Sequence, residues 1–389
     1  MQLSPQAGDL LRVIRSGAPR TRAELGDLTG WARVTVNARI DELLDARLVR
    51  PMGAANGARG RPAGRFGFDA SQGTLLIADV GASAARVARC DLNGTVLAQD
   101  TVPLFIGDGP DTVLGLVIDR LESLRAPGDA PAWGLGMSLP GPIEISTGRV
   151  VSPPIMTGWN GIAVPELLRP RYDLPILILN DSDAMAWGEH VRSVPRADDL
   201  LLVKVGTGVG AGIVANGRIV YGAQGAAGDL GHTVGHPVHP REAPPLCRCG
   251  KTGCIEAYAG GWAIARDLAA DGAAVTGLND VLRLLQAGDP RAIQRIREAG
   301  RVLGSGLALA VSLLNPSEIV VAGQLAVAGE HLLSGIREHV AANSLPLATR
   351  DLRIRTSDSP NEVGVTGVAH ALADWILAPE HLAATLARL

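Results

Sequence analysis

Residues 201–214 read LLVKVGTGVGAGIV, and this stretch decides between two kinds of α/β fold. Its apolar flanks predict two strands joined by a glycine-rich turn. A dinucleotide-binding fingerprint needs a helix directly after its glycines, but here a second strand and an Asn216-Gly217 hairpin turn follow. We therefore expect no Rossmann domain. A Gly-Thr-Gly loop between strands can instead turn its backbone N–H groups onto a phosphate, although a glycine-rich bulge without a ligand has the same sequence.

Two other apolar strands end in polar residues. Residues 75–81 read LLIADVG, and residues 176–191 read ILILNDSDAMAWGEHV, a strand followed by a helix that we expect to begin at Ala184. Binding and catalytic groups concentrate at such strand ends in α/β folds. Asn180 and Asp181 could orient a hydroxyl group and accept its proton. The alternative is that one of the two residues before Ala184 merely caps the helix.

Three of the four cysteines lie close together, whereas Cys90 lies alone in a strand-like stretch. The clustered residues are Cys247, Cys249 and Cys254. Thiolates at this spacing on a glycine-bent loop are typical of zinc ligands rather than of a disulfide framework. His232 can complete a tetrahedral Cys3His site, with His236 and His239 as rival fourth ligands. Because four protein ligands close the coordination sphere, we expect a structural zinc ion.

Composition places the chain among globular proteins of two or three domains. It has 389 residues, of which 47% are hydrophobic and 19% charged, so neither disorder nor a coiled coil accounts for it. The net charge of −3 is uneven, because residues 1–72 carry eleven arginines and seven acids, for +4, and the remainder carries −7. A basic head on an acidic body is expected where one module meets a polyanion. We find no membrane span or signal peptide and expect a cytoplasmic protein.

Residues 6–48 predict three short helices. The first is centred on residues 10–14. The second opens with the capping box Thr21-Arg22-Ala23-Glu24 and ends near Gly30. The third runs from about Arg33 to Ala46, with its apolar residues on one face.

A two-stranded wing is predicted after the third helix, with strands at 48–50 and 65–68 around a Gly/Ala-rich loop. Three helices and a wing form the winged helix-turn-helix plan, in which the third helix enters the major groove of DNA. The residues expected to contact DNA are Arg33, Thr35, Asn37, Arg59 and Arg61. The alternative is a protein-docking module whose arginines are merely solvated, and Ala32 is a poor cap for a recognition helix.

The sequence resembles the ROK family of repressors, uncharacterised reading frames and sugar kinases, specifically its repressor branch. The resemblance covers nearly the whole chain. Its motifs are DVGAS at Asp79, SLPGP at Ser138, the Asn180-Asp181 pair, GTGVGAG at Gly206, AGDLGH at Ala227, CRCGKTGCIE at Cys247 and NPSEIVVAGQ at Asn315. It implies an α/β fold: an actin-like, two-lobed, ribonuclease H-like ATPase body at 73–389, preceded by an α+β winged helix-turn-helix domain at 1–72. Lobe one would span about 73–183 plus the C-terminal helix, and lobe two about 184–365.

The resemblance also implies roles for single residues. In family kinases the residue matching Asp181 is the general base that takes a proton from the sugar hydroxyl as it attacks ATP. The sugar-binding positions are Asn180, Asp181, Asp229, His232 and Glu256. The positions for ATP, phosphate and Mg²⁺ are Asp79, Gly81, Ser83, Gly206, Thr207, Gly208 and Gly210.

Three departures from the family pattern bear on function. Gly81-Ala82-Ser83 stands where family kinases usually have Gly-Gly-Thr, which places a methyl group near the phosphate site and weakens the case for ATP. Asp229 replaces the usual glutamate, one methylene longer, of a sugar-binding motif. Pro153-Pro154 replaces a common Pro-Asn and removes an amide donor. These changes affect sugar identity more than sugar binding.

We therefore expect a transcriptional regulator, a repressor of carbohydrate genes. It would bind double-stranded operator DNA through its head and a sugar or sugar phosphate in its cleft, as a homodimer or homotetramer. The first alternative is an active ATP-dependent kinase of hexoses or N-acetylhexosamines, with Asp181 as base, Mg²⁺ and a DNA-binding head. The second is a protein-docking scaffold that binds no DNA.

Overall fold

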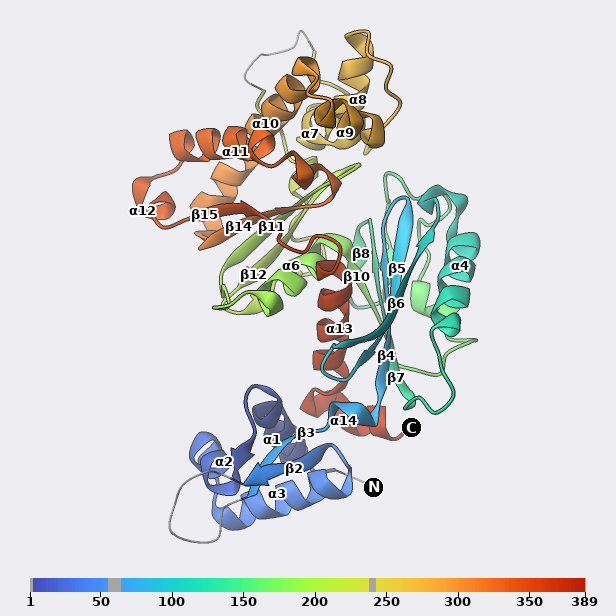
Figure 1. The fold of residues 1–389 in the computed structure, drawn as a ribbon, viewed down its shortest axis with the longest axis vertical. Helices are drawn as coiled ribbons and strands as arrows, with labels where there is room; N and C mark the ends of the chain where they lie inside the picture. Colours follow the sequence, from blue (N-terminus) through green and yellow to red (C-terminus); the bar gives the residue numbers. More distant parts are fainter. Residues whose placement is uncertain (1–2, 55–63, 238–242, 389) are drawn as a thin grey trace.

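The computed structural model describes residues 3–54, 64–237 and 243–388 (Figure 1). The N-terminal head contains three helices and a small sheet. Its elements are α1 (Pro5–Arg15), β1 (Arg20–Thr21), α2 (Arg22–Thr29), α3 (Arg33–Asp45), β2 (Val49–Ala54) and β3 (Gly64–Phe68). The three predicted helices and the wing are confirmed, and β1 adds a third strand by pairing with β3.

The start of α2 forms as the sequence predicts. The Thr21 hydroxyl accepts a hydrogen bond from the Glu24 N–H at 3.2 Å, and the Glu24 carboxylate accepts one from the Thr21 N–H at 2.7 Å. The helix ends at Gly30, whose φ of 69° lies in the left-handed region that glycine tolerates. The N-cap of α3, Ala32, makes no side-chain hydrogen bond, as expected.

The body has two five-stranded sheets with the same topology. In the first sheet the strands are β4 (Thr74–Val80), β5 (Ala84–Asp91), β6 (Val96–Pro103), β7 (Ala132–Leu139) and β10 (Ile176–Asn180). In the second they are β11 (Leu200–Val205), β12 (Val209–Ala215), β13 (Arg218–Ile219), β14 (Glu318–Ala322) and β15 (Arg353–Thr356). If the strands of each sheet are numbered 1 to 5 along the chain, their order across both sheets is 3-2-1-4-5. Strands 1, 2 and 3 are antiparallel to their neighbours among these three, and strands 4 and 5 are parallel to strand 1.

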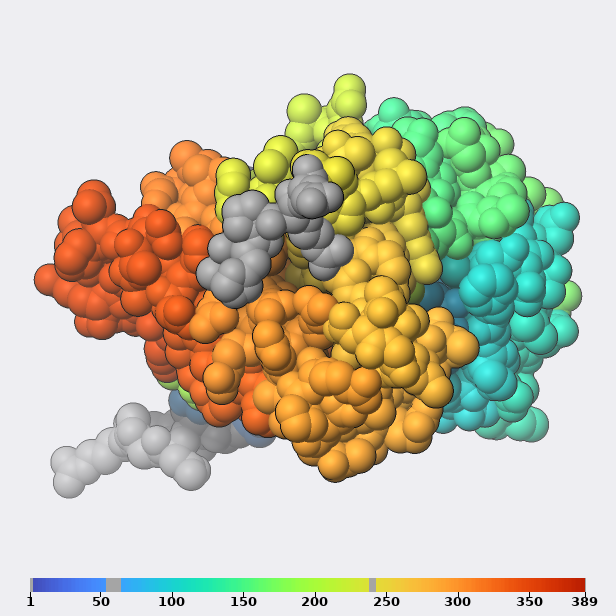
Figure 2. All heavy atoms as spheres, turned by 90° about the horizontal axis from the view of Figure 1, so that it is seen from above, coloured from blue at the N-terminus to red at the C-terminus, as the bar shows by residue number. Residues whose placement is uncertain are grey.

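Helices and short strands complete each lobe. Lobe one carries α4 (Pro110–Ser123), β8 (Ile143–Glu144), β9 (Arg149–Val150) and α5 (Val164–Leu168). Lobe two carries α7 (Glu256–Ala259), α8 (Gly261–Ala270), α9 (Leu278–Gln286), α10 (Pro290–Leu314), α11 (Glu330–Asn343) and α12 (Pro346–Thr349). Figure 2, seen from above, shows the yellow and orange surface of lobe two beside the cyan surface of lobe one.

Two helices cross between the lobes (Figure 1). They are α6 (Asp181–Arg192), which also packs on β11 and β12 of lobe two, and α13 (Val363–Ile376), which also packs on β4 and β7 of lobe one. Glycines let the two backbones meet, because a Cβ on Gly188 would lie 1.9 Å from the Val363 oxygen and one on Gly367 would lie 1.6 Å from the Ala184 oxygen. The crossing therefore joins the lobes at short range.

The head is seated on the end of the chain. The sequence predicted one C-terminal helix, whereas the structure has a second, α14 (Pro379–Leu386), which packs against α1. Pro379 lies against Gly8, where a Cβ would approach its Cα to 2.8 Å. Arg15 forms an ion pair with Asp374 of α13 at 3.1 Å. Buried residues of α1, α3, α13 and α14 belong to one hydrophobic core, so the head and lobe one are packed as a continuous body.

No helix in the described ranges combines the length and apolar character that crossing a membrane would require.

Candidate ligand cleft and metal centre

The first functional element is the start of α6. Asn180 ends β10 and caps the helix, since its Oδ1 accepts a hydrogen bond from the Ser182 N–H at 2.8 Å and its Nδ2 donates to the Gly141 oxygen at 2.9 Å. The helix therefore begins at Asp181, and the predicted start at Ala184 was wrong. The cause is a run of four polar residues, each able to cap. As a result Asp181 lies in the first turn, where the helix dipole favours a carboxylate.

Asp181 is buried and already paired. Its side chain is 7% exposed, and its Oδ2 contacts the ammonium group of Lys204. The Ser182 hydroxyl donates to its Oδ1 at 3.2 Å. Sequence analysis missed Lys204. Two features of the sequence could have identified it: the chain has only two lysines, and Lys204 lies inside an otherwise apolar strand.

Asp79 faces the same region from lobe one. Its Oδ1 accepts a hydrogen bond from the Ser138 hydroxyl at 2.7 Å, and Arg86 lies 4.0 Å from its Oδ2. Burial raises the pKa of Asp79; the hydrogen bond from Ser138 and the charge of Lys204 oppose this shift, and the charge of Asp181 adds to it. The two carboxylates and the ammonium group thus interact electrostatically.

The glycine loop between β11 and β12 packs tightly against its neighbours. A Cβ on Gly208 would lie 2.5 Å from a Glu256 oxygen, and one on Gly210 would lie 2.5 Å from the Ser182 hydroxyl oxygen. Close packing alone accounts for these two glycines. Of the other predicted phosphate positions, Gly81 and Thr207 are partly buried and Ser83 is exposed. Phosphate binding here stays a prediction.

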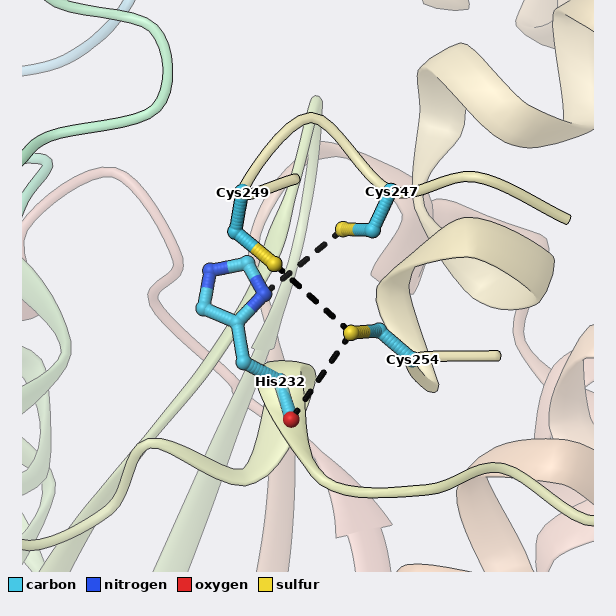
Figure 3. Close-up of side chains that lie close together, drawn as sticks. All are labelled: His232, Cys247, Cys249 and Cys254. Carbon is cyan, nitrogen blue, oxygen red and sulfur yellow. Dashed lines mark hydrogen bonds between the residues drawn. The ribbon is translucent and has the colours of Figure 1, made fainter. Parts of the chain in front are cut away.

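The three clustered cysteines and His232 meet at one point (Figure 3). Their ligand atoms all lie within 4.8 Å of one another. His232 Nδ1 lies 3.7 Å from Cys247 Sγ, and Cys249 Sγ lies 3.7 Å from Cys254 Sγ. A tetrahedral zinc ion would separate its ligand atoms by about 3.5–3.8 Å, given its usual bond lengths. The residues present therefore fit zinc.

The chemistry of the thiols agrees with this geometry. Burial raises the pKa of Cys247 to about 12 and also raises the pKa of Cys254, so thiolates form here only beside a strong positive charge. Among the rival ligands, His236 is exposed and lies outside the cluster, and His239 falls outside the described residues. Cys90 is fully buried away from the cluster.

The candidate metal site, formed by His232 and the three cysteines, adjoins the remaining predicted sugar positions. The Glu256 carboxylate accepts hydrogen bonds from the Val209 N–H at 3.0 Å and the Trp262 indole at 3.3 Å, and lies 3.8 Å from Cys247 Sγ. Burial raises the pKa of Asp229, and the charge of His232 opposes that shift. Nδ1 of His232 faces the cysteines, so Nε2 lies on the other side of the ring, away from Cys247. Sugar binding by these residues stays a prediction.

In the head, α3 presents a mixed surface. Arg33 is exposed, Thr35 and Asn37 are partly buried, and the Asn37 Oδ1 accepts a hydrogen bond from Arg22 at 3.1 Å. Val34 is 79% exposed beside Arg33, a position suited to contact a thymine methyl group, and sequence analysis did not single it out. Arg59 and Arg61 lie outside the described residues. All these DNA contacts stay predictions.

The chain is similar to known regulators and sugar kinases. Residues 76–374 match the model of the ROK family. A glucokinase of Halalkalibacterium halodurans is 31% identical over 74% of this chain and 92% of its own length. A xylose repressor of Bacillus spizizenii is 25% identical over 95% of this chain and 94% of its own. The crystal structure of a ROK family transcriptional regulator, a homologue of the E. coli MLC protein, has a TM-score of 0.81 at 25% identity, covering 98% of both chains.

Proposed function

Because the chain belongs to the ROK family, we propose that it is a sugar-responsive, DNA-binding transcriptional repressor of carbohydrate metabolism genes. In this proposal residues 1–72 form the DNA-binding domain and the two-lobed body at 73–389 takes the sugar. The similarity to the xylose repressor covers 95% of this chain and so includes the head. The similarity to the glucokinase covers only 74% of this chain. The basic, arginine-only head supports contacts with DNA phosphates.

One structural observation carries the proposal: two helices in backbone contact, α6 and α13, connect Asp181 to the head. Asp181 lies at the start of α6, α6 crosses α13 at backbone contact, and α13 bonds to the head through Asp374 and Arg15. A sugar that favours one arrangement of the lobes would bias α6 against α13 and so the position of the head. Such a ligand acts only through different affinities for the two states.

The zinc ion has a structural role in this proposal. His232 and the three cysteines would use all four coordination positions, which leaves none for a substrate. When bound, the ion fixes the His232 ring, so that Nε2 can bind a sugar hydroxyl while Asp229 lies nearby. The ion thereby shapes the cleft.

We also propose that the repressor is a homodimer or homotetramer. Four leucines of lobe two are exposed on connected elements: Leu309 and Leu313 one turn apart on α10, and Leu345 and Leu347 at α12. Their exposed fractions lie between 60% and 77%, and apolar surface of this kind marks interfaces. Two heads held by a symmetric dimer would match a palindromic operator.

The test is a fluorescence-anisotropy titration on duplex DNA from the region upstream of the gene. The expected affinity falls steeply with salt, and D-xylose, D-glucose or N-acetylglucosamine lowers it at least tenfold. Asp181→Asn should abolish the sugar response and keep DNA affinity. The matched control is Asp119→Asn, because Asp119 is an exposed residue of α4 in lobe one. Binding no tighter than to a scrambled duplex, or no response to any sugar, would contradict the proposal.

An ATP-dependent sugar kinase is the second candidate, favoured by the intact Asp181 and the similarity to the glucokinase. In that case the carboxylate would take the proton of the sugar hydroxyl that attacks the γ-phosphate, with stabilisation from positioned charges. A coupled ADP-release assay with the same sugars decides this. Turnover that disappears in Asp181→Asn would establish the kinase.

A further inference from the structure

Lys204 is placed by strand register, not by chance contact. It lies on the central strand β11, where its register partners are Gly210 on β12 and Ala322 on β14. Side chains alternate along a strand, so Lys204 shares a face with Leu202, which packs with Met185 and Ala186 of α6. That face is turned to α6, and only 25% of the Lys204 side chain is exposed. The sheet therefore directs its ammonium group onto Asp181.

The carboxylates near Lys204 are short of other cations. Among the residues that the structure describes, the side chain of Asp181 bonds only the Ser182 hydroxyl besides the ammonium group. Asp79 has the Ser138 hydroxyl and, at 4.0 Å, Arg86, which is 40% exposed and also bonds the Asn361 side chain at 2.7 Å. A Cβ on Gly364 would lie 2.3 Å from Asp79 Oδ2, so this carboxylate packs directly against the backbone of α13.

Two buried carboxylates in one region must be neutralised. Proteins meet this need by protonation, with paired basic side chains or with divalent cations, and Mg²⁺ is bound through one or two carboxylates together with substrate phosphates. Here the ammonium group of Lys204 supplies the positive charge next to Asp181. A divalent ion entering beside Asp181 would have to displace the ammonium group and would be repelled by it.

We propose that Lys204 is an internal counter-ion that replaces a divalent metal ion beside Asp181 and Asp79, and so restricts the cleft to uncharged sugars bound without a metal-nucleotide. This inference deepens the proposed function, on which its ligand class rests. A sugar hydroxyl can still donate to the carboxylate oxygens of Asp181 and accept from Lys204. Lys204 thus acts as a specificity-determining residue.

The experiment compares Lys204→Met, which removes the charge, with Lys204→Arg, which retains it. Mn²⁺ is the probe, followed by electron paramagnetic resonance on the full-length, zinc-loaded protein. We expect Lys204→Met to bind one additional Mn²⁺ at least tenfold more tightly than the wild type, and Lys204→Arg to behave as the wild type. Adding Asp79→Asn to Lys204→Met should remove the new site. Arg283→Met, at an exposed ion pair on α9, controls for loss of one charge.

Calorimetry with D-xylose and D-glucose gives the second readout. Wild-type affinity for either sugar should not change with MgCl2 or Mg²⁺-AMPPNP. Equal Mn²⁺ binding by the wild type and Lys204→Met, or Mg²⁺-AMPPNP binding by the wild type, would overturn the inference. If Lys204→Met gains the Mn²⁺ site but no sugar releases DNA from the wild type, the proposed function fails while the counter-ion role stands. A urea-unfolding midpoint close to that of the wild type, together with an unchanged zinc content, shows that the body of each variant is folded.

Discussion

Replacing Gly367 by alanine should force α6 and α13 apart. The new Cβ would lie 1.6 Å from the Ala184 oxygen, and its next neighbours are also backbone atoms, including the Gly188 nitrogen at 2.9 Å. Backbone cannot move aside as a flexible side chain can. The variant therefore tests whether close contact of these helices sustains both stability and the link between cleft and head.

The magnitude follows from the geometry. Real Cβ atoms essentially never lie within 3.0 Å of such atoms, so a Cβ placed at 1.6 Å requires a displacement of more than about 1 Å. A gap of that size forfeits about a quarter to a half of the dispersion energy across the contact. Overpacking typically costs about 1–3 kcal/mol and occasionally more, whereas alanine gains about 1 kcal/mol of helix propensity. At the upper end of that range we expect a net loss of roughly 2 kcal/mol in the free energy of unfolding.

The assay is urea unfolding monitored by tryptophan fluorescence, because Trp187 lies on α6 and Trp375 on α13. Gly115→Ala on α4 is the matched control, since a Cβ there meets nothing within 4 Å and should stabilise by about 0.5–1 kcal/mol. The sugar-dependent change in DNA affinity should also shrink in Gly367→Ala. Equal stability of the two variants would refute the packing argument.

The remaining predictions concern three single substitutions, at Cys249, Arg15 and Asp183. Cys249→Ser should release zinc and lower the melting temperature, and undiminished zinc by metal analysis would reject the site. Arg15→Ala, which removes the ion pair with Asp374 and a cation 5.5 Å above the Phe68 ring, should bring the DNA affinities with and without sugar closer together while calorimetric sugar affinity is unchanged. Burial raises the pKa of Asp183, so its favourable contribution to stability is lost as pH rises through that pKa. Asp183→Asn should therefore gain stability relative to the wild type between pH 4 and pH 8, and a pH-independent difference would count against this.

Local patterns predicted much of the fold. The capping box predicted the start of α2, and the apolar segments on either side of the glycine turn at 206–208 predicted β11 and β12 of lobe two. The two-residue strand β1 was missed because so short a segment carries no periodic signal. The contact of α14 with α1 could not be predicted either, since it joins segments far apart in the sequence and depends on the shape of the whole body.

The candidate site also contains residues that local sequence patterns predict and residues that they do not. The cysteine spacing and His232 identified a cluster that the structure brings together, because a short glycine-bent loop determines most of its geometry. Lys204 could not be assigned to Asp181, since that pair depends on how β11 packs against α6. Which of the polar residues from Asn180 to Asp183 caps α6 also depends on the backbone conformation of this segment, and the structure shows that the cap is Asn180.

The packing of α1 of the head against α14 has a consequence for the synthesis of the chain on the ribosome. Translation at about 5–20 residues per second separates α1, which starts at Pro5, from α14, which starts at Pro379, by roughly 20–75 s. During that interval the head emerges from the ribosome without its docking surface. Until α14 has emerged, Leu10, Ile40 and Leu43 can pack only against other residues of the head, and the nascent chain carries an undocked head before the body is complete.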